Sequence, residues 1–342
     1  MQSLRLDVII ATFNRCASLR STLDSLLAAR VPATLEVMVT VVDNNSSDDT
    51  RELVSSYEPG FRGRLRYLFE EQQGKSSALN TGILAATGDL VGMIDDDESV
   101  DPAWFETIEQ WFRRDDVDFI GGPYHPDWET PPPAWLPPEY NGVIGASDDT
   151  TPEVQTYGLD HFGMLPGGNA VIRRSIFDRV GLYSTTLLRY EDDDMYRRLL
   201  SAGARGKYVP ELVIRHRIHA SRLRKSYYRS WVFQLGVYLA HVQTQWPEAV
   251  PHFFGIPRYH YGRAVRSLTG LLGSAVKGNL DTSQVVSAEL PWWNLAGLLY
   301  GRCFNQARIA NVIPAVFRTS FAHSWEEPAR LDTGPASTGT IQ

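Results

Sequence analysis

Apolar runs with strand character alternate with helix-like segments along the first 120 residues of the chain. Leu6–Ala11 and Leu35–Val42 are rich in valine or isoleucine, whereas Ser18–Ala29 repeats leucine at helical spacing. Strands and helices that alternate in this way form a largely parallel sheet with helices on both faces. The sequence therefore predicts an α/β fold, in which ligands bind at the carboxyl ends of the strands.

Further strands and helices are expected on both sides of a proline-rich middle segment, Gly121–Trp135. Before it, strands are expected at Leu65–Phe69, Asp89–Ile94 and Val117–Ile120, and helices at Ser47–Tyr57, Ser76–Ala86 and Pro102–Arg113. After it, ordered elements are expected at Arg174–Val180, Glu191–Ala202 and Leu212–Arg215, and helix from Lys225 to about Phe321. Long irregular segments inside a domain are uncommon and often functional, so the middle segment is a candidate specificity region.

The composition indicates a globular protein and excludes several classes. The 342 residues carry a net charge of −7, without the basic excess typical of nucleic-acid-binding proteins. Two cysteines make a disulfide framework improbable and favour a reducing compartment. We find no apolar leader and no run of about 18 apolar residues. We therefore expect a cytoplasmic protein with, at most, peripheral contact with the inner membrane face.

Three adjacent carboxylates, Asp95-Asp96-Asp97, follow the apolar run Leu90–Ile94. Their mutual repulsion is relieved by a hard divalent cation, Mg²⁺ or Mn²⁺, which prefers oxygen ligands and completes its shell with substrate phosphates. In an extended stretch Asp95 and Asp97 point to the same side, so Asp96 is expected to face away and to be replaceable. The alternative interpretation is a solvated strand end.

A second acidic run, Glu191-Asp192-Asp193-Asp194, opens a predicted helix. The helix dipole favours one or two carboxylates in a first turn, but it does not require four. One of them is therefore a candidate general base, kept ionised by the helix N-terminus.

Polar turns follow the first two predicted strands, at Thr12–Arg15 and Asp43–Ser47. An aspartate that leaves a buried strand can accept a hydrogen bond from a pyrimidine imide, although helix capping explains part of the second turn. A P-loop is excluded, because Phe69 stands where the motif before Gly74-Lys75-Ser76 needs glycine. No G-x-G-x-x-G follows the first strand, which excludes a dinucleotide-binding fold.

Taken together, these segments resemble the glycosyltransferase family 2 pattern on the GT-A fold. The matching blocks are Ile9–Arg15, Val41–Thr50, Gly74–Gly82, Ile94–Asp97, Pro166–Arg174 and Glu191–Asp194, followed by His216. The departure is Ala11, where the family commonly has proline. The resemblance implies metal-dependent, inverting transfer from a nucleoside-diphosphate sugar to a hydroxyl of a glycan or lipid-linked acceptor.

The resemblance also implies a role for each site residue. Asp43 would bind the nucleobase of a UDP-, GDP- or dTDP-sugar, and Asp95 its ribose or sugar. Asp97 and His216 would bind Mg²⁺ or Mn²⁺, Asp192 would be the general base, and Glu191 would grip the acceptor. Further donor contacts are assigned to Thr12, Asn14, Arg15, Asn45, Lys75, Asn80 and Asp96, acceptor contacts to Gly168 and Asn169, and diphosphate contacts to Arg222 and Lys225.

The expected domain division follows from these blocks. A GT-A catalytic domain would span residues 1–225, with a nucleotide-binding half at 1–120 and an acceptor-binding half at 121–225. A helical extension at 226–325 and a flexible tail at 326–342 would follow. Two alternatives to a glycosyltransferase remain: a nucleotidyltransferase, which releases pyrophosphate, and a catalytically silent nucleotide-sugar-binding partner in a polysaccharide synthesis complex.

Overall fold

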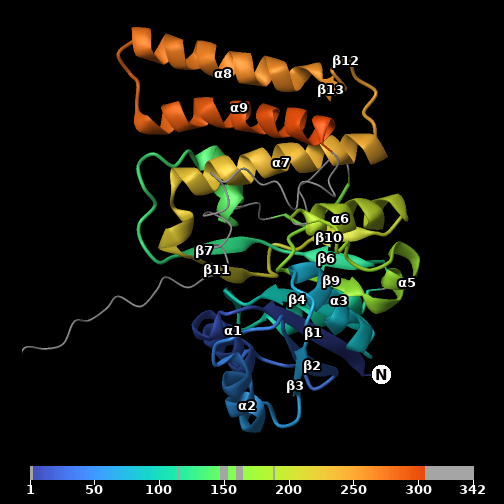
Figure 1. Ribbon diagram of the computed structural model, residues 1–342. Coiled ribbons are helices and arrows are strands. Elements are labelled where there is room, and N and C mark those ends of the chain that lie inside the picture. Colours follow the sequence, from blue (N-terminus) through green and yellow to red (C-terminus); the bar gives the residue numbers. More distant parts are fainter. Residues whose placement is uncertain (1–2, 115, 147–152, 159–164, 188, 305–342) are drawn as a thin grey trace, which may run out of the picture.

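A large mixed sheet forms the centre of the N-terminal part of the chain (Figure 1). The computed structural model describes residues 3–114, 116–146, 153–158, 165–187 and 189–304. Within them the sheet has the strand order β3-β2-β1-β4-β9-β6-β10-β8. Its strands are β1 (Leu4–Thr12), β2 (Leu35–Asp43), β3 (Leu65–Phe69), β4 (Leu90–Asp95), β6 (Phe119–Gly121), β8 (Gln155–Thr156), β9 (Ala170–Arg173) and β10 (Gly206–Tyr208).

Most neighbouring strands run parallel, which confirms the predicted sheet. Strands β3, β2, β1 and β4 are parallel, and so are β6 and β10. Two short strands are exceptions. Strand β9 runs antiparallel between β4 and β6, and β8 is antiparallel to β10 at the edge of the sheet. The parallel register aligns Thr12 with Asp43 and Ala11 with Asp95, which brings three strand ends together.

Helices cover both faces of the sheet, as the alternating pattern predicts. The first face packs against α1 (Cys16–Ala28), α2 (Thr50–Phe61) and α4 (Trp104–Phe112). The other face packs against α3 (Lys75–Ala85), α5 (Phe177–Val180) and α6 (Glu191–Ser201). Strand β1 serves both cores, because successive side chains alternate: Ile10 joins the first and Ile9 the second.

A second, smaller sheet lies beside the acidic triplet and has the order β5-β11-β7. Its strands are β5 (Glu98–Val100), β11 (Ile214–Ile218) and β7 (Tyr124–Trp128). The antiparallel register pairs His216 with Glu98, only one residue beyond Asp97. The strand predicted at Leu212–Arg215 is therefore shifted, and His216 lies within it. Short helical turns, η1 (Pro138–Ile144), η2 (Arg174–Ile176) and η3 (Ala220–Arg222), connect these elements.

Three long helices form the C-terminal layer of the described chain: α7 (Lys225–Gln245), α8 (Arg258–Val276) and α9 (Thr282–Cys303). Helix α9 packs between α7 and α8, and α8 is the outermost (Figure 1). A small hairpin, β12 (His252–Phe253) and β13 (Ile256–Pro257), precedes α8. In the described part, no helix is long and apolar enough to cross a membrane. The helix expected beyond residue 304 and the tail at 326–342 lie outside the described residues.

Candidate active site

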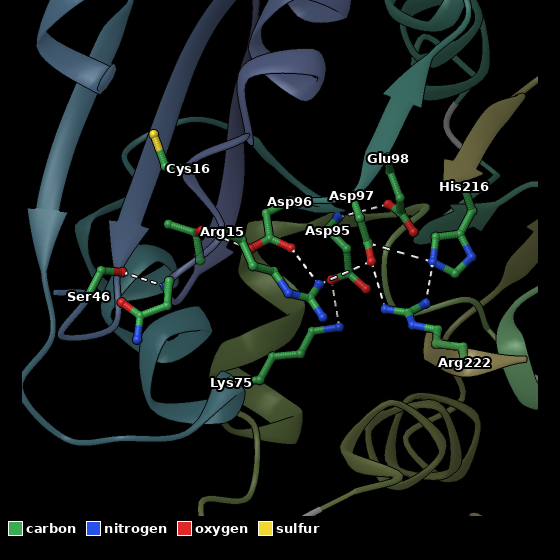
Figure 2. Close-up of polar contacts among 12 residues, drawn as sticks. Arg15, Cys16, Ser46, Lys75, Asp95, Asp96, Asp97, Glu98, His216 and Arg222 are labelled. Atoms are coloured by element: carbon green, nitrogen blue, oxygen red, sulfur yellow. Dashed lines mark hydrogen bonds and ion pairs between the residues drawn. The ribbon is translucent and has the colours of Figure 1, made fainter. Parts of the chain in front are cut away.

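The acidic triplet lies at the end of β4, in the turn that leads into β5. Figure 2 shows three cationic side chains pointing into it: Lys75 from the start of α3, Arg15 from the turn before α1, and Arg222 from η3. Three cations thus face three carboxylates. The protein's own cations therefore relieve the repulsion from which we expected a metal ion. The charge of the triplet alone does not require a metal ion.

Asp95 is the most open member of the triplet. Its side chain is 32% exposed, compared with 2% for Asp97, and its Oδ1 lies 2.6 Å from Lys75 Nζ. Its backbone N–H donates to Glu98 Oε2 over 2.8 Å. Asp95 therefore has a fixed backbone and an accessible carboxylate, as contact with a donor sugar or ribose requires.

Asp96 is buried, contrary to the expectation that it faces away and is replaceable. It accepts hydrogen bonds from Thr12 Oγ1 at 2.8 Å and from Arg15 Nη1 at 3.0 Å. The alternation argument was wrong because β4 ends at Asp95 and the chain turns there, which directs Asp96 back toward β1. Burial raises the pKa of Asp96 to about 6, although Arg15 opposes the rise. Asp96 thus anchors the Thr12–Arg15 turn.

Asp97 and His216 come together from distant parts of the chain, as predicted. Asp97 Oδ1 lies 3.6 Å from His216 Nε2. Arg222 joins both, because its Nη2 donates to Asp97 Oδ2 and its Nη1 lies on His216 Nε2, each over 2.7 Å. Burial alone would raise the pKa of Asp97, but Arg222, His216 and Arg15 hold it well below the ordinary value. Asp97 is therefore a carboxylate that stays ionised.

The chemistry of this pair fits a divalent cation whose shell the substrate completes. His216 Nδ1 faces the Gly145 carbonyl oxygen at 3.2 Å, so a proton on Nδ1 leaves the Nε2 lone pair free to accept from Arg222 Nη1, the position that a metal ion would take. Gly145 has φ +64°, and a Cβ there would lie 2.7 Å from the imidazole. Among the described residues, however, no three His, Cys, Asp or Glu side chains form a metal cluster. A cation would need diphosphate and water ligands as well, and Arg222 would have to leave.

Asp192 differs from the rest of the second acidic run. Asp193 accepts hydrogen bonds from Tyr238 and Arg197, and Asp194 from Arg198, so both carboxylates stabilise the fold. Asp192 Oδ1 is buried without a hydrogen-bond partner among the described residues. A Cβ on Gly167 would lie 2.0 Å from Asp192 Oδ2, so only glycine permits this close approach.

The surroundings of Asp192 favour its neutral form more than water does. Burial, followed by the charge of Glu191, raises the pKa of Asp192 to about 7, while Lys75 acts in the opposite direction. Burial would lower the pKa of Lys75, but Asp95, Asp192 and Glu191 raise it well above its ordinary value. Lys75 therefore remains charged between the two acidic clusters and couples them electrostatically.

The two polar turns of the nucleotide-binding half lie against each other. Asn14 has φ 52°, donates its N–H to Ser46 Oγ at 2.9 Å, and accepts from the Ser47 N–H at 2.7 Å. Asp43 is buried and accepts from Tyr67 OH at 2.6 Å and from the Ser46 N–H at 2.8 Å. Asn45 is exposed and has φ 68°. Hydrogen bonds between side chains and backbone thus hold the two turns together, and Asn14 chiefly links one turn to the other.

Three predicted contact residues have partners within the protein. Asn169 is completely buried, donates to the carbonyls of Leu212 and Pro123, and accepts from Trp104 Nε1, so the predicted acceptor contact was wrong. Asn80 makes a reciprocal pair with the Tyr183 backbone, which indicates a structural role rather than a donor contact. Lys225 Nζ lies 5.9 Å from the centre of the Trp135 ring, and its diphosphate contact stays a prediction.

Two residues of the site were not predicted. Glu98 is buried with its carboxyl against Gly168, where a Cβ would lie 2.3 Å from Oε1. Burial raises the pKa of Glu98 well above its ordinary value, and Asp95 and Asp97 add to the rise. Tyr124 OH accepts from the Gly168 N–H at 2.6 Å. Glu98, as a fourth consecutive acid, carried a recognisable signal, whereas Tyr124 in the proline-rich segment carried none.

The family model described as glycosyl transferase family 2 matches residues 7–181, which include both strand-end turns, the triplet and the glycine pair. The chain belongs to glycosyltransferase family 2. Among curated relatives, a glucosyl-dolichyl phosphate glucuronosyltransferase of Haloferax volcanii is 28% identical over 55% of this chain and 59% of its own length. The succinoglycan biosynthesis protein ExoM of Rhizobium meliloti is 26% identical over 65% and 69%. This family 2 chain thus spans less than two thirds of the glucuronosyltransferase.

Solved structures show that this family 2 chain has the GT-A fold. Mannosyltransferase PcManGT from Pyrobaculum calidifontis, in complex with GDP-Man and Mn²⁺, aligns with a TM-score of 0.60, 19% identity and 88% coverage of both chains. S. aureus TarS 1–349, in complex with UDP-GlcNAc, aligns with a TM-score of 0.52, 15% identity, and coverage of 84% of this chain and 91% of TarS. The similarity extends over most of the described chain and confirms the predicted fold class.

Proposed function

We propose that this protein transfers a sugar from a nucleoside-diphosphate sugar to a hydroxyl of a glycan or lipid-linked acceptor, with inversion at the anomeric carbon. The observation that carries the proposal is the buried, unpartnered Oδ1 of Asp192, on a carboxyl whose pKa is raised to about 7. A base with a pKa near the working pH is half ionised and accepts protons effectively. A single displacement needs a base but no nucleophile from the protein, and Asp192 can serve as that base.

The acceptor would lie over the glycine pair. Gly167 and Gly168 bring the backbone within reach of the carboxyls of Asp192 and Glu98, and no side chain intervenes. Asp192 would take the proton of the acceptor hydroxyl as its oxygen bonds to the anomeric carbon. Glu191, buried beside it at the start of α6, would orient the acceptor and raise the basicity of Asp192. Acceptor choice would depend on residues 122–165, of which the structure describes 122–146, 153–158 and 165.

The donor would lie along the strand ends, with its base near Asp43 and its ribose or sugar near Asp95. Asp97 and His216 would hold Mg²⁺ or Mn²⁺, which when bound neutralises the charge that develops on the leaving diphosphate. Arg222 would then move from Asp97 to the diphosphate oxygens, where a guanidinium binds in a bidentate manner. The PcManGT complex, which holds GDP-Man and Mn²⁺ on the same fold, supports this arrangement.

Donor hydrolysis provides a direct test of the class of reaction. The full chain is incubated with UDP-, GDP- and dTDP-sugars, each with Mg²⁺, with Mn²⁺ and with a chelator, and the nucleotide products are separated. We expect one donor to yield nucleoside diphosphate and free sugar. A nucleotidyltransferase would instead consume a sugar phosphate and nucleoside triphosphate and release pyrophosphate. A silent binding partner would bind a donor without turnover.

Asp192→Asn tests the assignment of the base. We expect transfer to fall by roughly 10²- to 10⁴-fold, the usual contribution of a general base, while donor affinity changes little. Asp193→Asn is the matched control, since Asp193 is the neighbouring residue and its carboxylate already accepts hydrogen bonds from Tyr238 and Arg197. Turnover of Asp192→Asn at the wild-type rate would remove Asp192 from the mechanism.

A further inference from the structure

The outermost helix, α8, carries an apolar stripe that no described residue covers. Exposed side chains at Val265, Leu268, Leu272 and Val276 follow one another at intervals of three or four residues, so they share one face of the helix. Leu272 is 65% exposed and Val276 89%. Exposed large apolar side chains are normal when scattered, but a continuous row indicates an interaction surface.

The hairpin before α8 adds two exposed aromatic side chains. Phe253 and Phe254 are also exposed, Phe254 by 75%, and their rings contact each other. Another side of α8 is held in the protein: His260 and Ala264 are buried, and Ser267 Oγ donates to the Ala288 carbonyl oxygen of α9. Helix α8, the outermost helix in Figure 1, is therefore anchored on one side and has exposed aliphatic side chains on another.

The charge of this segment is opposite to that of the whole chain. The protein has a net charge of −7, yet residues 249–280 contain no aspartate or glutamate. The same segment contains Arg258, Arg263, Arg266 and Lys277. Arg266 and Lys277 are exposed on α8 or directly after it, and their helical positions flank the apolar stripe, whereas Arg263 lies on another side of the helix. The surface is thus amphipathic and cationic, which favours an anionic partner with an apolar interior.

We infer that α8 and Phe253-Phe254 form a docking surface for an anionic lipid bilayer, with the apolar stripe in the interface and the cations against the headgroups. A second copy of this chain is a poorer occupant, because a symmetric contact places the same patch on both subunits and brings like charges together. The inference extends the proposed function, since a lipid-linked acceptor resides in a membrane, but its test does not depend on catalysis.

Vesicle co-sedimentation of the full chain tests the inference. We compare vesicles of phosphatidylcholine with vesicles that also contain phosphatidylglycerol, and expect binding to the anionic vesicles that weakens as salt is raised. Each cation near such a surface contributes roughly a fivefold gain in partitioning, so Arg266→Gln with Lys277→Gln should lower it about 25-fold. Leu272→Glu with Val276→Glu should abolish it.

Leu84→Glu provides the matched control, because Leu84 is 73% exposed on α3, in the catalytic part. This variant should bind vesicles like the wild type, and circular dichroism checks that every variant is folded. Equal binding to both kinds of vesicle, equal loss in Leu84→Glu, or a dimer that the Leu272/Val276 double variant dissociates would overturn the inference. Donor hydrolysis is measured on the same samples: its absence with vesicle binding intact rejects the proposed function alone.

Discussion

Asp192 is an unusual carboxyl, because a base with a pKa near 7 is only partly ionised at neutral pH. If Asp192 accepts the acceptor's proton, kcat/KM should rise with pH and level off above about pH 7. Below that pH the protonated form predominates, so the rate should fall about tenfold per pH unit. A profile measured with saturating metal gives the midpoint. A flat profile between pH 5 and 8 would contradict the assignment.

Two neighbours should move this midpoint in opposite directions. Lys75 lowers the pKa of Asp192, so Lys75→Met should shift the profile to higher pH; Glu191 raises it, so Glu191→Gln should shift the profile to lower pH. Both variants also lose contacts, so the readout is the midpoint rather than the maximal rate. Lys207→Met is the control. It removes a lysine whose Nζ donates to Thr156 Oγ1, and it should leave the midpoint unchanged.

In the proposed arrangement, Arg222 would compete with a metal ion for Asp97 and His216. Removing it should strengthen binding of Mn²⁺ to the nucleotide-free protein roughly tenfold, since hydrogen bonds to charged groups contribute about 1.5–3 kcal/mol each. With nucleoside diphosphate present, Arg222→Ala should weaken Mn²⁺ binding, because the diphosphate loses a partner. Electron paramagnetic resonance of free Mn²⁺ measures both, and Arg224→Ala, an exposed neighbour, is the control. Changes of the same sign would exclude competition.

At the residue scale, the motifs identified which side chains gather but not what each contacts. Asp95, Asp97 and His216 come together as expected because parallel register aligns strand ends and β11 pairs with β5. Asp96 and Asn169 were misassigned because their contacts, with Thr12 and Arg15 and with Trp104 and Leu212, come from segments 43 to 84 residues away. A linear motif carries no information about such partners.

At the scale of elements, long periodic segments were predictable and short ones were not. Strand β3 has the predicted bounds, and α1, α3, α4 and α6 lie within a few residues of theirs. Strands β5, β9 and β10 were missed, since three or four residues are too few to show a period, and their conformation depends on neighbouring strands. These missed strands hold the triplet and the glycine pair in place.

Helices α7 and α9 touch through glycines, which makes their packing sensitive to one methyl group. A Cβ at Gly297 would lie 1.9 Å from the Phe233 carbonyl oxygen. Gly297→Ala should therefore lower the melting temperature, at a cost of about 1–3 kcal/mol for overpacking. Gly273→Ala in α8 meets nothing within 4 Å, and should be neutral or slightly stabilising, as alanine favours helix. Thermal unfolding of both variants compares them; equal melting temperatures would contradict this account.

At the scale of the whole molecule, the α/β architecture and a helical C-terminal layer were both predictable from periodicity. The layering was not: amphipathic patterns indicate that α7, α8 and α9 pack, but not that α9 lies between the other two. The expected division at residue 120 remains a prediction. The large sheet spans this point. Strand β9, from the second half, lies between β4, from the first half, and β6, which contains residue 120.

The place of β9 has a consequence for how the chain is made. A ribosome delivers β1 to β4 first, and the hydrogen-bonding edge of β4 must then wait for residues 170–173, about 75 residues later. During that interval the nascent chain has an unpaired strand edge at β4, which is a site for chaperone binding or misassembly. The triplet at the tip of β4 would thus become ordered only after the glycine pair and β9 had been synthesised, so the catalytic centre would form late in translation rather than with the nucleotide-binding strands.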